Sequence, residues 1–345
     1  MRNIVFQALA EAARNSELVT LGIISGVKGS SPQKVGAKAL FYADGRIKGT
    51  LGGGCLEAEI QQRAIQSLRT GQSSTFDLLL DHDFGWDDGL ICGGKVLGLI
   101  LPNAQAVGEK FWSDLAERNR SLAWGVDPAF HIRKDELPRV PDPLALETAR
   151  NLHSGTRGSS SFPEEQWLYR ETVTPPCALW IAGAGHIAQA VAPLALQLDF
   201  DVTVLDDRPA LASHQFFPKE IRLQADVWDK LLALPLPAVP SFALIVTRGH
   251  RHDALVLKEW IHKPFEFIGM IGSSRKARTI FEHFVEEKIA TAEEIQKVSC
   301  PVGIRIEAQS VAEIAVSIMA QYIDKRAALA AKSRGAAAGK LELVR

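Results

Sequence analysis

The sequence predicts an α/β protein with an N-terminal α+β domain followed by a C-terminal doubly wound parallel sheet. In the C-terminal half, short apolar runs at 179–181, 202–205 and 242–247 alternate with amphipathic helical segments, as in βαβ units. In the N-terminal half, strand-like segments follow one another with a hairpin signal, Asp44-Gly45, between two of them. These two patterns indicate two domains of different architecture.

Length and charge are those of an ordinary globular protein. The 345 residues are 46% hydrophobic, which is enough for two separate cores. The net charge of −1 provides no basic field for nucleic acid or a membrane surface. Residues 1–16 lack the apolar segment of a signal peptide, and no stretch resembles a membrane span. Four cysteines are too few for a disulfide scaffold, so a cytoplasmic location is expected.

The composition changes along the chain predict the domain limits. A Pro-, Ser- and charge-rich stretch separates the two halves, and an Ala- and Gly-rich stretch ends the chain. The expected parts are an N-terminal domain at 1–125, a linker and connecting segment at 126–176, a Rossmann-like domain at 177–330 and a flexible tail at 331–345. The expected N-terminal strands are 18–27, 37–42, 46–51, 75–80 and 96–101.

Three consecutive glycines end the hairpin and begin a helix. Gly52, Gly53 and Gly54 precede Cys55, and a helical pattern starts at Leu56. Backbone N–H groups at such a turn form a nest that, with the helix N-terminus, favours phosphate or another oxyanion. The helix dipole also favours the thiolate form of Cys55. A tight turn with a buried, inert cysteine explains the same residues equally well.

Cys92 is a second cysteine next to glycines, at the start of an apolar strand. Cys55 and Cys92 lack the ligand spacing of a zinc site. The polar residues that precede Cys92 are His82, Asp83, Asp87 and Asp88. A run of acids in a surface loop is more often solvated than metal-bound, so the metal ligands stay unknown.

The stretch from Gly183 to Asp206 has the order of a nucleotide-binding turn. Gly183 permits a tight turn, Gly185 lets a pyrophosphate approach the backbone, and Ala188 lets the helix pack closely. The helix that starts at His186 would offer N–H groups to phosphates, and Asp206 could accept hydrogen bonds from ribose hydroxyls. We therefore predict a Rossmann domain that binds a nucleotide, with glycines that only allow close packing as the alternative.

The choice of nucleotide stays open at this stage. An acid at the position of Asp206 favours an unphosphorylated ribose, whereas Arg208 follows two residues later. Two further polar clusters, 248–253 and 272–277, follow buried strands at the sheet edge where such folds bind ligands. Within the first, His250 is either a binding residue or a helix cap.

Seven motifs in order resemble those of the XdhC/CoxI family. They are Gly29–Pro32, Gly52–Glu57, Cys92–Gly94, Gly183–His186, Asp206–Pro209, Thr247–His250 and Ile271–Lys276. Members of that family are accessory factors of molybdenum hydroxylases such as xanthine dehydrogenase. The resemblance implies a homodimer that binds the molybdenum cofactor (molybdopterin). It also implies that the protein protects this cofactor during sulfuration by a cysteine desulfurase and delivers it to an apo molybdenum hydroxylase.

The residues of the motifs give the expected cofactor-binding set. It comprises Gly183, Gly185, His186, Ala188, Asp206, Gly52, Gly53, Gly54, Cys55 and Cys92. The Gly-Gly-Gly-Cys run resembles the CoxI branch and Cys300-Pro301 the XdhC branch, so the client hydroxylase stays open. No catalytic residue is assigned, and a cofactor chaperone is favoured over an enzyme.

Two other classes of function compete with this interpretation. An NAD(P)-dependent oxidoreductase needs a proton relay, for which His186, His250 and Asp253 are the candidates. The sequence contains no Tyr-x-x-x-Lys pair to support it. A regulatory protein that senses a nucleotide is the third possibility.

Overall fold

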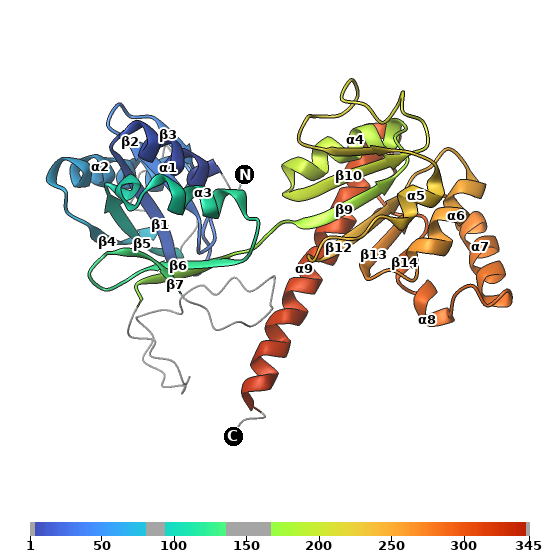
Figure 1. Cartoon of the computed structure of the whole chain (residues 1–345). Coiled ribbons are helices and arrows are strands. Elements are labelled where there is room, and N and C mark those ends of the chain that lie inside the picture. Colours follow the sequence, from blue (N-terminus) through green and yellow to red (C-terminus); the bar gives the residue numbers. More distant parts are fainter. Residues whose placement is uncertain (1–3, 81–93, 136–166, 343–345) are drawn as a thin grey trace. The chain divides into compact units, whose positions relative to one another are not determined.

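The computed structural model describes residues 4–80, 94–135 and 167–342 (Figure 1). The chain forms two compact units, Met1–Pro175 (unit 1) and Pro176–Arg345 (unit 2). Unit 1 has antiparallel sheets and unit 2 has a parallel sheet, which confirms the predicted fold class.

Unit 1 is built on a five-stranded antiparallel sheet with the order β3-β2-β1-β5-β4. Its strands are β1 (Val19–Lys28), β2 (Lys38–Tyr42), β3 (Ile47–Gly49), β4 (Ser74–Leu80) and β5 (Gly94–Pro102). Side chains alternate between the two faces of these strands, as the strand period requires. Leu40 packs into the core that includes α1 (Ile4–Asn15), whereas its neighbour Phe41 packs into the core that includes α2 (Gly54–Thr70).

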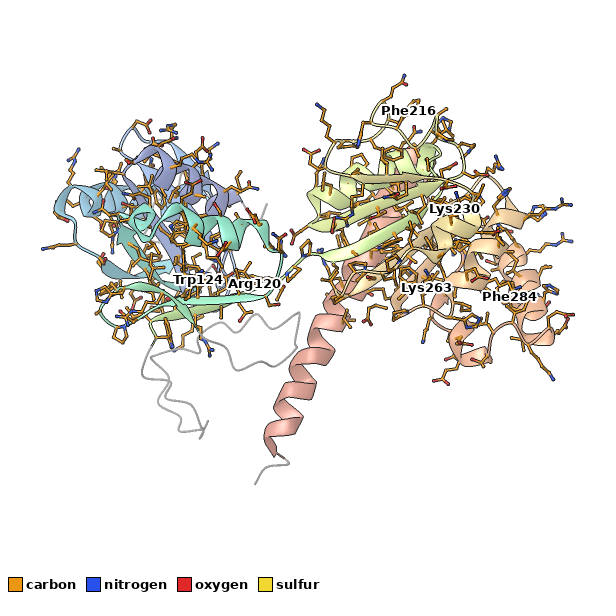
Figure 2. All side chains as sticks on the ribbon, viewed as in Figure 1. Arg120, Trp124, Phe216, Lys230, Lys263 and Phe284 are labelled. Carbon is orange, nitrogen blue, oxygen red and sulfur yellow. The ribbon has the colours of Figure 1, made fainter. Side chains whose placement is uncertain are left out.

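A second, three-stranded sheet completes unit 1. It has the order β7-β6-β8 and comprises β6 (Leu122–Val126), β7 (Ile132–Asp135) and β8 (Tyr169–Val173). Trp124, labelled in Figure 2, is fully buried in the α1 core together with Trp112 of α3 (Glu109–Glu117), which follows the 3-10 turn Ala104–Val107. Strands β7 and β8 lie within the segment 126–176, which the sequence predicts as a connection. Because their apolar side chains join this core, the described parts of that segment belong to the domain itself.

A buried ion pair joins the two sheets of unit 1. The Lys38 Nζ on β2 lies 2.6 Å from the Glu171 Oε2 on β8, and the two side chains are only 7% and 12% exposed. The same carboxylate oxygen accepts hydrogen bonds from Trp124 Nε1 at 3.2 Å and Tyr169 Oη at 3.1 Å. Burial and the Glu171 charge raise the pKa of Tyr169 well above its usual value. Lys38 also donates to the carbonyl of Gly36 at 2.8 Å, which ties down the loop before β2.

Replacing Lys38 with methionine should lower the free energy of unfolding of unit 1 by about 3–5 kcal/mol. The apolar side chain leaves the Glu171 carboxylate buried without its cation. Urea unfolding combined with hydrogen exchange of β2 and β8 would measure the loss. As a control, Arg63→Met removes only the exposed pair with Glu59 and should cost about 0.5 kcal/mol or less. Equal stability of the two variants would show that the Lys38–Glu171 pair contributes little.

Unit 2 contains a six-stranded parallel sheet with the order β11-β10-β9-β12-β13-β14. The strands are β9 (Cys177–Ala182), β10 (Phe200–Asp206), β11 (Arg222–Ala225), β12 (Ser241–Ile245), β13 (Phe265–Met270) and β14 (Val298–Ser299). Counted from β9, this order is 3-2-1-4-5-6, that of the Rossmann fold. The strand order reverses between β9 and β12, and ligands of such sheets bind at that switch point.

Helices cover both faces of this sheet (Figure 1). They are α4 (His186–Gln197), α5 (Trp228–Ala233), α6 (His250–Trp260), α7 (Ser274–Glu286), α8 (Ala292–Ile295) and α9 (Val311–Glu342). On one face α4 packs against α9, whose Tyr322 donates a hydrogen bond to the Ala243 carbonyl at 2.5 Å. On the other face, Lys263 (Figure 2) donates to the Leu232 and Leu234 carbonyls at the end of α5. Helix α9 continues into the segment 331–345, which the sequence predicts as a flexible tail. Within the described ranges, no helix is long and apolar enough to cross a membrane.

Candidate functional site

The glycine turn after β9 contains two glycines with different requirements. Gly183 has a φ of +113°, and a Cβ there would lie 2.3 Å from the Val246 carbonyl oxygen, so the fold itself demands glycine. Gly185 has a φ of −75°, and a Cβ there would meet no atom within 4 Å. Ala188 is fully buried under the turn. The space beside Gly185 is therefore open to a ligand that approaches the backbone.

Two helices begin at the switch point without a capping side chain. Helix α4 starts after Gly185 and α6 after Gly249, and neither N-cap provides a side-chain hydrogen bond. By contrast, α7 is capped by Ser273, whose Oγ accepts the Lys276 N–H. N–H groups in the first turn of an uncapped helix are the groups that bind phosphates. The exposed His186 is the first residue of α4, so it borders the same opening.

Asp206, predicted to contact a ribose, is occupied by protein donors. Its side chain is 1% exposed. Oδ2 accepts the Ala184 N–H at 2.6 Å and Arg208 Nη2 at 2.8 Å, and Oδ1 accepts the Arg208 N–H and Nε. The carboxylate thus fastens the glycine turn to the end of β10. A ribose contact by Asp206 stays a prediction, and it would need one of these donors to be displaced.

The hydrogen bonds of the Asp206 carboxylate predict how the stability of the fold depends on pH. Burial raises the pKa of this carboxyl, but the hydrogen bonds from Arg208 and from the Ala184 N–H outweigh burial and hold the pKa below its usual value. Because the folded pKa is the lower one, the stabilisation is complete above about pH 4, the ordinary Asp pKa, and is lost as the pH falls further. Asp206→Asn should therefore be less stable than wild type at neutral pH, and the difference should shrink below about pH 4 in thermal melts.

Two more ion pairs lie at the same edge of the sheet. Arg248, after β12, lies 2.8 Å from the Asp207 Oδ2, after β10. Asp253 is 1% exposed, accepts the Thr247 N–H and Oγ1–H, and pairs with Lys276 Nζ at 2.5 Å. The sequence contains these residues but does not show their pairing. The Asp253–Lys276 pair follows from the adjacency of β12 and β13, whereas the Arg248–Asp207 pair reaches past β9.

The glycine nest of unit 1 lies at the start of α2. Gly52, Gly53 and Gly54 all have positive φ, at +123°, +73° and +59°. Gly53 is the N-cap and has no side-chain cap, and half-buried Cys55 lies in the first turn. Glu57 fixes this turn, because its Oε2 accepts the Leu51 N–H at 2.8 Å.

A second loop reaches the nest from β1. A Cβ on Gly52 would lie 2.7 Å from Pro32 Cγ, and one on Gly94 would lie 1.8 Å from the Ser30 carbonyl oxygen. Described residues of three motifs that are separated in sequence therefore meet around the loop 29–32 in unit 1. Cys92 and the acidic run 82–88 lie outside the described residues. Among the residues described, no three His, Cys, Asp or Glu side chains are placed to hold a metal ion.

Comparisons with known proteins found matches for both halves of the chain. The model of the XdhC and CoxI family matches residues 12–79, and that of the XdhC Rossmann domain matches residues 179–322. A probable xanthine dehydrogenase subunit from Bacillus subtilis (strain 168) is 25% identical over 335 residues, which cover 90% of this chain and 94% of that protein. The molybdenum cofactor insertion chaperone PaoD of Escherichia coli (strain K12) is 24% identical over 324 residues, covering 93% and 88%.

One solved structure has the same fold over nearly the whole chain. The crystal structure of a xanthine dehydrogenase from Bacillus halodurans matches with a TM-score of 0.74 and 24% identity. The match covers 94% of this chain and 96% of that one. That similarity concerns the fold. The two family models, which match one segment in each unit, lead to one conclusion about the family. The chain is a member of the XdhC and CoxI family, with the family's Rossmann domain as its second unit.

Proposed function

We propose that this protein is an accessory factor that binds the molybdenum cofactor and assists its insertion into a molybdenum hydroxylase. The main support is the similarity to the insertion chaperone PaoD, which runs through both units and not through one shared domain alone. A relative described as a probable subunit of xanthine dehydrogenase points to the same class of client.

The glycine nest of unit 1 is the proposed site for this cofactor. Molybdopterin carries a phosphate and a dithiolene, and when bound it supplies molybdenum and sulfur to the client. Helix α2 begins after its N-cap Gly53 without a side-chain cap, and the backbone N–H groups of Gly53 and Gly54 suit the phosphate. The Cys55 thiol is a soft ligand suited to molybdenum or to a transferred sulfur, and we assign Cys92 the same role. These residues would hold and shield the cofactor, and no step of catalysis is required of them.

Sulfuration of the cofactor and the cytoplasmic location are proposed from the family resemblance. The factor would protect the cofactor while a cysteine desulfurase sulfurates it, and it would work in the cytoplasm. Xanthine dehydrogenase is the first client to test, because the Bacillus subtilis relative carries that name.

The test is cofactor retention and transfer. The protein is purified from a host fed with molybdate, and its bound molybdenum and pterin are measured. It is then mixed with apo xanthine dehydrogenase, whose activity should rise. Protein that holds neither molybdenum nor pterin and activates no apo hydroxylase would contradict the proposal.

Nucleotide binding by unit 2 is a second proposed property. The observation that favours it is the pair of uncapped helix N-termini at the switch point, next to the open space at Gly185. NAD(P) is the expected class of ligand. Calorimetry at millimolar nucleotide tests this property separately from molybdenum. Oxidation or reduction of a bound nicotinamide by a substrate would instead indicate an oxidoreductase.

The protein is also expected to be a homodimer. This expectation rests on the family resemblance. Light scattering at micromolar protein should give twice the 37.6 kDa of one chain. A mass equal to one chain at that concentration would contradict it.

A further inference from the structure

We infer that the nucleotide site of unit 2 selects a ribose that carries a 2′-phosphate, as in NADP(H), over a ribose with free hydroxyls. The inference rests on the proposed nucleotide binding by unit 2 and specifies its ligand. It reverses the preference that the acid at position 206 suggests in the sequence.

The first support is that the Asp206 carboxylate, which would accept hydrogen bonds from ribose hydroxyls, is already occupied by protein donors. In NAD-binding Rossmann domains, an acid at the end of the second strand accepts hydrogen bonds from the ribose hydroxyls. A carboxylate has about four acceptor sites. Asp206 uses its oxygens for the Ala184 N–H, the Arg208 N–H, Arg208 Nε and Arg208 Nη2, all at 2.6–2.9 Å. At 1% exposure it offers little to a sugar hydroxyl.

The second support is that the same bonds orient a guanidinium. Arg208 is held by two parallel contacts to Asp206, and its side chain is 32% exposed. Only some of its five N–H donors are used there. A guanidinium fixed in this way loses little entropy when it binds a phosphate, and its fork matches phosphate oxygens. Rossmann sites that bind NADP use an arginine near this position.

The third support is a second arginine at the switch point. Arg248 follows β12 and pairs with Asp207, which follows β10, and its side chain is 45% exposed. Because β9 lies between those two strands, this pair links the loops on either side of the glycine turn. A phosphate beside Arg208 would compete with Asp207 for the Arg248 guanidinium. The Arg208 and Arg248 side chains are more exposed than those of Asp206 and Asp207, and their N–H donors suit a phosphate.

Calorimetry of the full chain with 2′,5′-ADP and with 5′-ADP tests the inference. Both probes carry two phosphates: 2′,5′-ADP has one of them on the ribose 2′-oxygen, whereas 5′-ADP has both in a 5′-diphosphate. Because 2′,5′-ADP bears about one more negative charge at neutral pH, the binding ratio is compared with that of the arginine variants. We expect 2′,5′-ADP to bind about tenfold tighter, equivalent to about 1.4 kcal/mol, and NADPH to bind tighter than NADH. Arg208→Gln removes the guanidinium and releases Asp206, so the ratio should fall to one or below.

Two further variants complete the design. Arg248→Gln removes a more exposed side chain and should reduce the ratio while unit 2 stays folded, which covers the case that Arg208→Gln does not fold. Arg222→Gln is the matched control, because Arg222 pairs with Asp201 at 2.6 Å near the opposite end of β10. It should leave the ratio unchanged.

The possible results distinguish the 2′-phosphate preference from nucleotide binding itself. Tighter or equal binding of 5′-ADP overturns the 2′-phosphate preference, while nucleotide binding stands. A preference that survives in both Arg208→Gln and Arg248→Gln overturns the assignment to these arginines. If none of 2′,5′-ADP, 5′-ADP, NADPH and NADH binds at millimolar concentration, nucleotide binding and the preference are both wrong.

Discussion

Gly185→Val should abolish nucleotide binding by unit 2 and leave its sheet folded, whereas Gly183→Ala should destabilise the sheet. At Gly185 the backbone angles suit any residue, and a Cβ meets nothing within 4 Å. The two added methyl groups therefore fill only the space that a pyrophosphate needs. We expect the affinity to fall about a hundredfold or more, with a loss of stability below about 1 kcal/mol.

Gly183→Ala is the matched comparison within the same turn. Its Cβ would lie 2.3 Å from a backbone oxygen of Val246, at a φ that side chains rarely adopt. Backbone cannot yield as a flexible side chain can, so the cost should be at least about 2 kcal/mol. Thermal melts and calorimetry on both variants distinguish the two effects. Wild-type nucleotide affinity in a folded Gly185→Val protein would show that the ligand does not approach this turn.

Cys55→Ala and Cys92→Ala together should lower the molybdenum and pterin that copurify with the protein by about tenfold or more. Cys55 lies in the first turn of α2, directly after the glycine nest, and the helix N-terminus favours its thiolate. Cys92 precedes Gly94, whose backbone contacts the loop on that nest. Transfer of cofactor to apo hydroxylase should fall in parallel.

The other two cysteines are controls in unit 2. Cys177 is 4% exposed at the start of β9. Burial raises the pKa of the Cys300 thiol, although Lys276 nearby lowers it, so the thiolate is disfavoured there. Cys177→Ala and Cys300→Ala should load cofactor as wild type does. If the double Cys55/Cys92 variant also loads its client normally, both thiols are structural and the glycine nest alone binds the cofactor.

Local sequence was sufficient for the elements that carry strong patterns. The run from β9 through the glycine turn to α4 and β10 agrees closely with the prediction, because apolar strands buried on both faces and a helical stripe are local signals. The hairpin of β2 and β3 and helix α2 are also where the sequence places them.

Weakly patterned elements could not be found in this way. Strand β11 is mostly exposed, and it is a strand only because it pairs with β10 at the sheet edge. Strand β14 has two residues and depends in the same way on β13. Strand β8 is separated from β6 and β7 by a long stretch of chain, so no local signal joins it to them in one sheet.

In the candidate sites, too, the sequence predicted the local features and not the contacts that depend on the fold. Sequence alone located the glycines of both turns, since a positive φ or close backbone approach restricts the residue type wherever it occurs. The motif assigned the tight turn to Gly183 and the approach of a ligand to Gly185, but only the structure shows that the atom Gly183 must avoid belongs to Val246. Nor could the sequence tell that Asp206 is occupied. Hydrogen-bond acceptors are filled by whichever donors the fold brings near, and here one of them, the Ala184 N–H, arrives from the turn after a neighbouring strand.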